Sequence, residues 1–439
     1  MGIHLQFRNI ITKGQINEKS EDDIPNIINS LKEHQSWLHE LSVDDIIEYF
    51  DKLGKHWKNE ITLHEKFGIS LEHIVDFISK ENLMKELSLS LRGNYKVLDT
   101  FCTLDNDAKR LYHAQPRGLA VHWIAGNVPV LGVISLFQSL LTKNKSIVKV
   151  PANFKNLLPT ILEDLNDSSY FSKPVKEIID TLLSSVLILY IDQEDFESQQ
   201  KLSRNADIRI VWGGLEAVSS VIRLEKKINC RDIIFGPKIS LAYVSKNRLQ
   251  DEKDLTLLSK ALADDIFAFD QAGCNSPHNL LIEKGSKYNI HKIAKNISES
   301  FDSKSRGSNH ISEPIDKFNL LTKKFLYQSN DKFSVISGSD DEWGVFINKS
   351  NTTKIEEPLY GRTVFLSEVK NLEEIGKILP TNIQSLGLFT KTKEKDQIIQ
   401  TLSNFGVDRF PDIGKMSLYE NPWDGYMPLQ QMVKWISSN

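Results

Sequence analysis

From Pro116 onward, short apolar runs alternate with segments of helical apolar spacing, and this alternation restricts the fold more than any other feature of the chain. We expect strands at Leu119–Ala125, Ser146–Val150, Val186–Ile191, Asp207–Trp212 and Ile239–Val244, and helices at Val130–Leu141 and Leu215–Leu224. Strands that alternate with helices of about ten residues are typical of a parallel sheet covered on both faces. The sequence therefore predicts an α/β fold that binds ligands at the carboxyl ends of its strands.

A second series of the same kind follows and predicts a second parallel-sheet unit. Its expected elements are helices at Asp251–Asp265, Tyr288–Phe301, Leu372–Leu379 and Glu394–Phe405, and strands at Asn279–Glu283, Arg362–Leu366, Ser385–Phe389 and Val407–Phe410. The first hundred residues carry helical spacing at Ile24–Leu41, Val43–Lys55 and Leu71–Leu91, with Ser42 and Ser70 as expected N-caps. We expect the polar stretch Lys304–Glu313 to lie at the surface, and the apolar tail around Val433 and Trp435 to pack.

Composition excludes several classes of protein. With 439 residues and a net charge of −4, the chain has room for two or three lobes and no overall basic field for nucleic acid. Three scattered cysteines form neither a disulfide framework nor a zinc pattern. The longest nearly apolar run, Val128–Leu141, is too short to span a bilayer, and the first residues lack a signal-peptide core. We expect a cytoplasmic protein without a metal site or a membrane span.

Cys274 stands out among the three cysteines. It lies between an expected helix and an expected strand, and Gly273 and Ser276-Pro277 flank it. Such a turn aims a thiol outward, whereas Cys102 and Cys230 lie among ordinary core or helix residues. Since an isolated cysteine is most often a buried structural thiol, the turn by itself leaves both interpretations open.

Two strand ends of the first unit have residues suited to binding. In Ala125-Gly-Asn-Val-Pro129, Gly126 permits a tight turn and Asn127 projects an amide at the edge of the sheet. In Trp212-Gly213-Gly214, the backbone can approach a ligand, such as a pyrophosphate, at a helix N-terminus. Plain turns remain alternatives for both segments. No Gly-x-Gly-x-x-Gly fingerprint is present, so an ordinary dinucleotide fold is not supported.

From about Pro116 to the C-terminus, an ordered set of short motifs resembles the aldehyde dehydrogenase superfamily and, within it, the LuxC-type acyl-CoA reductases. The motifs are Ala125-Gly-Asn-Val-Pro129, Lys143-Asn-Lys-Ser-Ile-Val-Lys149, Trp212-Gly-Gly214, Phe235-Gly-Pro-Lys238, Asp270-Gln-Ala-Gly-Cys-Asn-Ser-Pro277, Leu359-Tyr-Gly-Arg362 and Trp423-Asp-Gly425. Each motif is weak alone, but their common order across the chain is specific. The resemblance implies an aldehyde-dehydrogenase-like fold with a Rossmann-like cofactor domain, a catalytic domain and a helical N-terminal layer.

The resemblance also assigns roles to single residues. Cys274 falls on the catalytic nucleophile of the superfamily, and Asn127 falls on the asparagine whose amide helps to form the oxyanion hole. Lys149 falls on the lysine that contacts the adenosine ribose or its 2′-phosphate. Trp212, Gly213 and Gly214 fall on the loop beside the cofactor pyrophosphate. On this basis we divide the chain into a helical region 1–100 that packs on a cofactor domain 101–248, a catalytic domain 249–410 and a C-terminal segment 411–439 that returns to pack on the body.

The departures from the superfamily pattern bear on the reaction. Ile234 replaces the glutamate that activates the deacylating water in hydrolytic relatives, which argues against hydrolysis. After Lys149, the segment Val150-Pro151-Ala152 lacks the acidic partner of an NAD ribose and favours NADPH. The ribose-binding glutamate of the superfamily aligns nearest Pro358, with Glu357 one position away, so that role stays open.

Together these features predict NADPH-dependent reduction of an acyl-CoA or acyl-protein thioester to the aldehyde through an acyl-cysteine. The resemblance implies an acyl-protein synthetase as a partner and a homo-oligomer as the assembly. Two alternatives stay open: another enzyme of the superfamily, an acyl phosphate reductase or an aldehyde oxidiser, and a non-catalytic subunit that binds acyl groups or a partner.

Four further polar residues require an interpretation. His122 alternates within an apolar strand, which favours a packed core histidine over a catalyst. His278 follows the expected nucleophile by four residues, so its imidazole either tunes the thiolate or packs in the emerging strand. Asp270 and Gln271 are expected to hold the cysteine loop by hydrogen bonds.

Overall fold

The computed structural model describes residues 7–12, 15–16, 26, 28–29, 31, 35–104, 107–126, 128–151, 158, 161, 173–306, 314–339, 341–350 and 352–439. The chain forms two compact units. The first comprises Met1–Gly236, Tyr419–Asn421 and Tyr426–Asn439, and the second comprises Pro237–Leu418 and Pro422–Gly425. Within the described residues, no helix has the length and hydropathy needed to cross a membrane.

A seven-stranded sheet in the order β2-β1-β7-β6-β5-β8-β9 forms the centre of the first unit. Its parallel strands are β5 (Leu119–Trp123), β6 (Lys145–Val150), β7 (Val186–Ile191), β8 (Ile208–Trp212) and β9 (Arg231–Phe235). In chain order these strands lie as 3-2-1-4-5, the order of a doubly wound fold. The direction of winding therefore reverses between β5 and β8, the point where such folds bind ligands. The chain thus has the predicted α/β class.

Helices cover both faces of this sheet. They are α7 (Pro129–Leu141), α9 (Lys173–Ser184), α10 (Phe196–Asn205) and α11 (Leu215–Ile222). On one face, Leu202 of α10 and Val218 of α11 share a buried core with the strands. The helical N-terminal region packs on α7: the rings of Phe50 and Phe137 meet edge to face with centroids 4.5 Å apart.

The N-terminal region contains α2 (Gln35–Glu40), α3 (Val43–Trp57), α4 (Ile61–Phe67), α5 (Ile69–Phe77) and α6 (Lys80–Ser90). Ser42 caps α3 as predicted, because its Oγ accepts the Asp45 N–H at 3.1 Å. The predicted cap at Ser70 is wrong: Gly68 precedes α5, and Ser70 lies inside the helix. The run 71–91 is broken into two helices, and Ser79 caps the second. Much of the helix expected over 24–41 lies outside the described residues.

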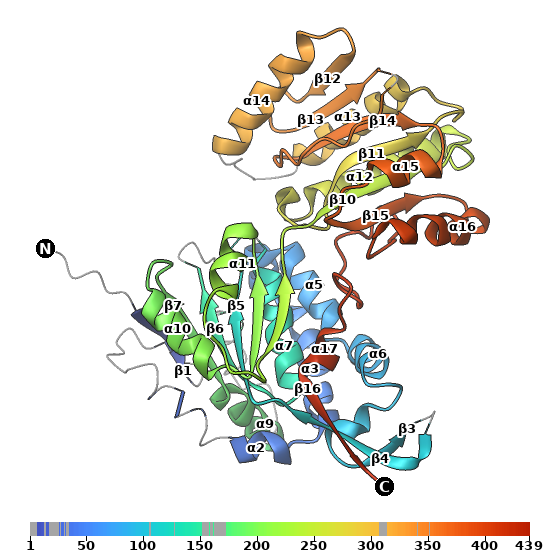
Figure 1. The fold of residues 1–439 in the computed structure, drawn as a ribbon. Helices are drawn as coiled ribbons and strands as arrows, with labels where there is room; N and C mark the ends of the chain where they lie inside the picture. The colour runs from blue at the N-terminus through green and yellow to red at the C-terminus, as the bar shows by residue number, and fades with distance from the viewer. Residues whose placement is uncertain are drawn as a thin grey trace, which may run out of the picture. The chain divides into compact units, whose positions relative to one another are not determined.

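Two additions to this unit were not anticipated from the sequence. β1 (Phe7–Thr12) and β2 (Gln15–Ile16) extend the sheet in antiparallel pairing from the edge of β7. A separate antiparallel sheet joins β16 (Val433–Ser438), β4 (Asp107–Pro116) and β3 (Cys102–Leu104). Figure 1 shows β16 in red running beside β4 in cyan. The apolar tail therefore packs, as predicted.

The second unit has a six-stranded sheet in the order β12-β13-β14-β11-β10-β15. Its strands are β10 (Ile239–Val244), β11 (Pro277–Glu283), β12 (Phe333–Ser337), β13 (Gly344–Asn348), β14 (Thr363–Val369) and β15 (Ile383–Phe389). All neighbouring pairs are parallel except β12 with β13. The parallel strands, such as β10, β11 and β15, are almost fully buried, as parallel strands covered on both faces are, whereas the antiparallel edge strand β12 is half-buried.

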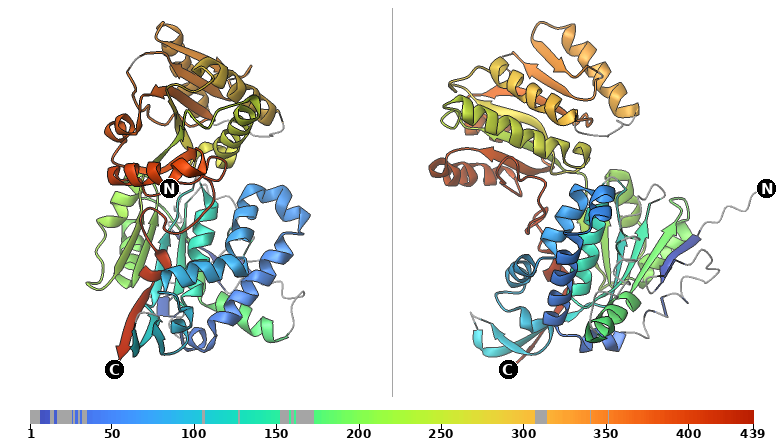
Figure 2. Two further views of the ribbon diagram at one scale, coloured as in Figure 1. Left: turned by 90° about the vertical axis from the view of Figure 1, so that its right-hand side faces the viewer. Right: turned by 180° about the vertical axis from the view of Figure 1, so that it is seen from behind.

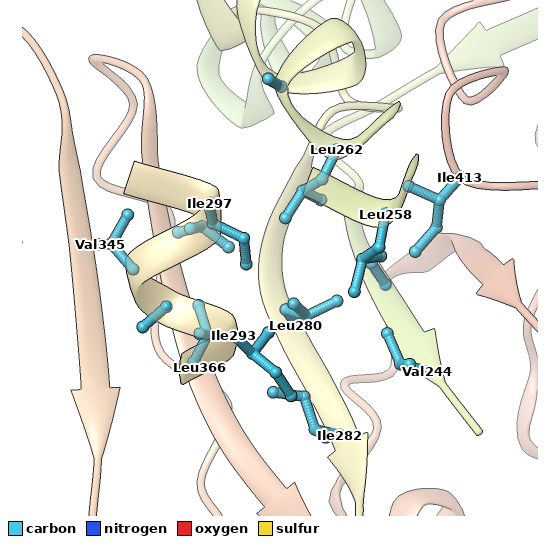
Figure 3. Packing of buried hydrophobic residues seen from close by; sticks show 14 of the residues in the cluster. Val244, Leu258, Leu262, Leu280, Ile282, Ile293, Ile297, Val345, Leu366 and Ile413 are labelled. Atoms are coloured by element: carbon cyan, nitrogen blue, oxygen red, sulfur yellow. The ribbon is translucent and has the colours of Figure 1, made fainter. Parts of the chain in front are cut away.

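The helices of the second unit are α12 (Glu252–Phe267), α13 (Ile290–Ser305), α14 (Pro314–Gln328), α15 (Leu372–Ile378) and α16 (Thr392–Leu402). On one face of the sheet, α12 and α13 lie side by side (Figure 2). Their Leu258, Leu262, Ile293 and Ile297 side chains point toward Leu280 and its neighbours on the strands (Figure 3). On the opposite face, Ile375 of α15 and Ile398 of α16 share a second core with β15.

Three expectations need correction or restriction. The strand Ile239–Val244 does not complete the first set: as β10 it lies between β11 and β15 in the second sheet. A short apolar run specifies a buried strand, but it carries no information about which sheet pairs with it. The segment Val407–Phe410 forms no strand, and its pairing with β15 is a single isolated bridge between Arg409 and Ser385. Of the stretch 304–313, Lys304 and Ser305 belong to α13 and residues 307–313 lie outside the described part.

Candidate active site

Cys274 lies on a turn between α12 and β11, as the sequence predicted. α12 ends at Phe267, and the following residues Phe269, Asp270 and Gln271 have φ angles of 51°, 52° and 62°. Residues other than glycine rarely adopt this left-handed backbone conformation. Several such residues in a row occur where surrounding contacts stabilise them, often at functional sites. β11 begins at Pro277, so Cys274 lies at the amino-terminal edge of the second sheet.

Gln271 holds this turn from inside the protein. Its amide nitrogen donates to the carbonyl oxygens of Thr363 at 2.6 Å and Pro277 at 3.0 Å, and its amide oxygen accepts the Thr363 N–H at 2.7 Å. Asp270 pairs with Arg362, the residue that directly precedes β14. The prediction that Asp270 and Gln271 hold the cysteine loop by hydrogen bonds is therefore confirmed.

Further hydrogen bonds hold the backbone at the cysteine itself. The Ser240 hydroxyl donates to the Cys274 carbonyl oxygen at 2.7 Å and accepts the Ser385 N–H at 3.2 Å. The Asn275 amide donates to the Met416 carbonyl oxygen at 3.0 Å. Gly273 must lack a side chain, because an added Cβ would lie 2.4 Å from Asn275 Oδ1. The thiol is therefore carried on a rigid backbone.

The surroundings of the thiol favour its protonated form in the resting protein. Cys274 as a residue is partly exposed, but burial of the thiol raises its pKa to about 12. The negative charge of Asp424 contributes to this increase, whereas a hydrogen bond from Gln384 and the positive charge of Arg409 limit it. Only the thiolate is a strong nucleophile, so activation requires a group that favours the anion.

Sequence reasoning did not identify Gln384, Arg409 or Asp424 as neighbours of the thiol. Asp424 belongs to the motif Trp423-Asp-Gly425, for which the resemblance implies no role. No sequence motif marks Gln384 or Arg409 as a neighbour of the thiol. Both follow Cys274 by more than one hundred residues and approach it only in the folded sheet.

The two histidines are buried and neutral. His278 lies in β11 with its ring edge to face against Tyr360, and burial lowers its pKa to about 3. It is not among the groups that shift the pKa of the thiol. His122 is fully buried in β5, and its Nδ1 lies 2.8 Å from Ser135 Oγ. The interpretation of His122 as a packed core histidine is confirmed.

The residues predicted to bind a cofactor meet at the carboxyl edge of the first sheet. Lys149 lies at the end of β6, opposite Trp123 at the end of β5. Burial lowers the pKa of Lys149, while nearby Asp192 raises it. Trp212 ends β8, which is the neighbour of β5 on its other side. Asn127, in the loop after β5, lies outside the described residues.

The two glycines after Trp212 have different surroundings. A Cβ on Gly213 would lie 3.0 Å from the Cβ of Ala217, whereas a Cβ on Gly214 would meet no atom of the described residues within 4 Å. Gly214 is the N-cap of α11 and provides no side-chain cap. The Trp212 ring stacks on Phe235 with centroids 3.7 Å apart. An accessible helix N-terminus at the switch point of a doubly wound sheet suits an anionic group such as a pyrophosphate.

Comparison with known proteins agrees with this arrangement. The model of the family described as "Acyl-CoA reductase (LuxC)" matches residues 38–435. The "Long-chain acyl-protein thioester reductase" of Aliivibrio fischeri is 26% identical over 423 residues, which cover 90% of this chain and 82% of the relative.

Solved structures show the same fold. Aldehyde dehydrogenase 21 from Physcomitrella patens, in complex with the reaction product succinate, has a TM-score of 0.68 at 11% identity, covering 100% of this chain and 95% of its own. A 3,6-anhydro-L-galactose dehydrogenase in complex with NAP has a TM-score of 0.62 at 13% identity, covering 99% and 96% of the two chains. The predicted aldehyde-dehydrogenase-like fold is thus confirmed, and the chain belongs to the acyl-CoA reductase (LuxC) family of oxidoreductases.

Proposed function

We propose that the protein reduces a long-chain acyl thioester to the aldehyde with NADPH, through an acyl group carried on Cys274. The observation that carries this proposal is the placement of Cys274 on a turn held by Ser240, Gln271 and Asn275. A thiol on so rigid a backbone suits attack along one direction, which is what acyl transfer to a cysteine needs.

In the proposed first step, the Cys274 thiolate adds to the thioester carbonyl, and the donor thiol leaves. The Asn127 amide and a backbone N–H at the cysteine would stabilise the tetrahedral oxyanion. Losing one such donor typically slows a reaction by about 10²–10³. Ile234 supports reduction over hydrolysis, because it lies with apolar residues of the first core and offers no carboxylate to activate water.

A nicotinamide cofactor, when bound, would supply the hydride that reduces the acyl group. The doubly wound strand order, the accessible Gly214 at the start of α11 and the partly buried Lys149 suit such a cofactor. The NAP complex of the structural relative supports the same class of cofactor. Lys149 would hold the ribose or its 2′-phosphate, and Trp212, Gly213 and Gly214 would line the pyrophosphate.

The proposal extends to the acyl donor and to assembly. The name of the Aliivibrio fischeri relative supports a protein-bound acyl group as donor, besides acyl-CoA. An acyl-protein synthetase would then hand its acyl group to Cys274. We also propose a homo-oligomer, by analogy with the assemblies of the superfamily.

The test is intact mass spectrometry after mixing the protein with tetradecanoyl-CoA in the absence of nicotinamide. We expect an acyl-sized adduct on the wild type and on Cys102→Ala, but not on Cys274→Ala. Added NADPH should discharge the adduct to aldehyde. No adduct in a folded protein that binds NADPH would contradict the proposal, and turnover of an acyl phosphate or of an aldehyde would replace it with one of those reactions.

A further inference from the structure

A buried pair of polar side chains, Gln384 and Asp424, has no part in the chemistry proposed so far. Gln384 lies near the start of β15 and is fully buried, and Asp424 is 7% exposed. The Gln384 amide nitrogen donates a hydrogen bond to Asp424 Oδ1. Asp424 and Gly425 have φ angles of 49° and 76°, so a left-handed turn carries the carboxylate to the pair.

Both side chains keep one buried oxygen without a hydrogen-bond partner among the described residues. These atoms are Gln384 Oε1 and Asp424 Oδ2. Most buried polar atoms in proteins have a partner, so two adjacent exceptions call for an explanation in terms of function. The pair is therefore poorly explained as a purely structural contact.

The pair is linked to the cysteine by geometry. The Ser240 hydroxyl joins the Cys274 carbonyl oxygen to the backbone N–H of Ser385, the residue after Gln384. Gln384 also acts on the thiol through a hydrogen bond, and Asp424 acts on it through its charge. Gln384 thus contacts the carboxylate directly and adjoins Ser385, whose backbone Ser240 joins to the nucleophile.

Other charged and titratable groups lie around Cys274 and the Gln384–Asp424 pair. The Arg409 guanidinium lies over the Trp423 ring, 4.5 Å from its centroid, and Lys238 pairs with Asp408. Burial raises the pKa of Asp424 to about 6, and Asp408 also raises it, while Gln384, Lys238 and Arg409 lower it. Burial raises the pKa of the Tyr360 hydroxyl, and negative charge at Cys274 and Asp316 raises it further. At neutral pH, Asp424 is therefore mainly charged and opposes a second negative charge on the sulfur.

We propose that the Gln384–Asp424 pair controls the ionisation of Cys274. Asp424 orients the Gln384 amide so that it donates to the sulfur, and its carboxylate keeps the sulfur protonated in the resting protein. Asp424 is a positioning residue that acts through Gln384 and through its field. The inference rests on the proposed function only in taking Cys274 as the nucleophile; the ionisation itself is measured without substrate.

The experiment is the pH profile of Cys274 alkylation by iodoacetamide, followed by peptide mass spectrometry, with Cys102 as the internal reference. Asp424→Asn removes the charge but keeps an oxygen that accepts from Gln384. Each unit by which a thiol pKa falls multiplies the thiolate fraction tenfold, and reduced nucleophilicity offsets part of the gain, so we expect alkylation at pH 8 to be about three- to tenfold faster.

Gln384→Met keeps the size of the side chain but cannot donate a hydrogen bond, so we expect slower alkylation than in the wild type. Asp412→Asn serves as the matched control, because Asp412 pairs with Lys395 and does not act on the thiol. If the pair had only a structural role, Cys274 would be alkylated at the same rate in Asp424→Asn and in Gln384→Met.

Alkylation of Asp424→Asn at the wild-type rate or slower would overturn the proposal. If Asp424→Asn does not fold, a Gln384→Met profile identical to that of the wild type would also overturn it. Failure of the proposed function would look different. Asp424→Asn would still be alkylated faster and Gln384→Met more slowly than the wild type, but the protein would form no adduct with tetradecanoyl-CoA.

Discussion

The guanidinium of Arg362 and the carboxylate of Asp270 join two left-handed turns that lie far apart in the sequence. Arg362 Nη2 and Nε lie 2.6 and 3.1 Å from Asp270 Oδ1, and the guanidinium lies 4.6 Å from the centroid of the Phe267 ring. One turn holds Asp270 and leads to Cys274; the other comprises Tyr360, Gly361 and Arg362, whose φ angles are 59°, 63° and 60°. The ion pair therefore ties the cysteine loop to the start of β14.

The first prediction concerns Arg362→Lys. Lysine keeps the charge but loses the planar donors and the stacking on Phe267, so we expect about 1–2 kcal/mol of lost stability in urea unfolding. Acylation of Cys274 should slow by roughly 10², because the turn that aims the thiol loosens. Arg306→Lys is the control, since Arg306 pairs with Asp302 and its side chain is 78% exposed. Equal effects in the two variants would contradict the role of the Arg362 pair.

The second prediction is the pH dependence of the wild-type thiol. Because burial raises the pKa of Cys274 to about 12, alkylation in the folded protein should rise about tenfold per pH unit from pH 7 to 10 without a plateau. In urea, where the thiol is solvated, the rate should level off above a pH of about 8.5–9. The raised pKa also means that this group stabilises the fold below a pH of about 8.5, and that the contribution is lost as the pH rises toward the folded pKa. A plateau near neutrality in the folded protein would show that the resting residue is already a thiolate.

The third prediction tests cofactor choice at Lys149. In Lys149→Met, a side chain of similar length loses its charge, so NADPH should bind about tenfold or more weakly by fluorescence titration. Binding of NADH should weaken less, because NADH lacks the 2′-phosphate. Lys201→Met on α10 is the control, since Lys201 pairs with Glu197 on the same helix. Equal losses for both cofactors would reassign Lys149 to a part of the site that the two cofactors share.

The fourth prediction concerns close packing beneath the cysteine loop. A Cβ on Gly387 would lie 2.3 Å from Met416 Sδ, and the Met416 carbonyl oxygen holds Asn275 beside Cys274. We expect Gly387→Ala to cost about 1–3 kcal/mol in urea unfolding, because Met416 is fully buried and must shift. Gly236→Ala, where a Cβ would have no neighbour within 4 Å in the part of the chain that the structure describes, should stay within about 0.5 kcal/mol of the wild type. A neutral Gly387→Ala would show that Met416 repacks freely.

Local patterns in the sequence were sufficient for most of the buried parallel strands and for the cysteine turn. Apolar runs such as Val186–Ile191 predicted buried strands, and Ser42 predicted the start of a helix. These properties depend on near neighbours, which the sequence displays directly. The predicted cap at Ser70 is wrong because the helix already begins at Ile69, after Gly68, and propensity alone does not locate that boundary.

Pairing between distant segments required the tertiary structure. Nothing in Ile239–Val244 distinguishes a strand of the first sheet from one of the second, and β1 gives no sign that it pairs with β7. The same holds at the cysteine. Its place on a turn follows from short-range sequence, whereas Arg362 and Thr363, the partners through which Asp270 and Gln271 hold that turn, come from a segment about ninety residues away. The Gln384–Asp424 pair and the pKa of the thiol depend on burial and on charges brought together by folding, because both effects act through space and not along the chain.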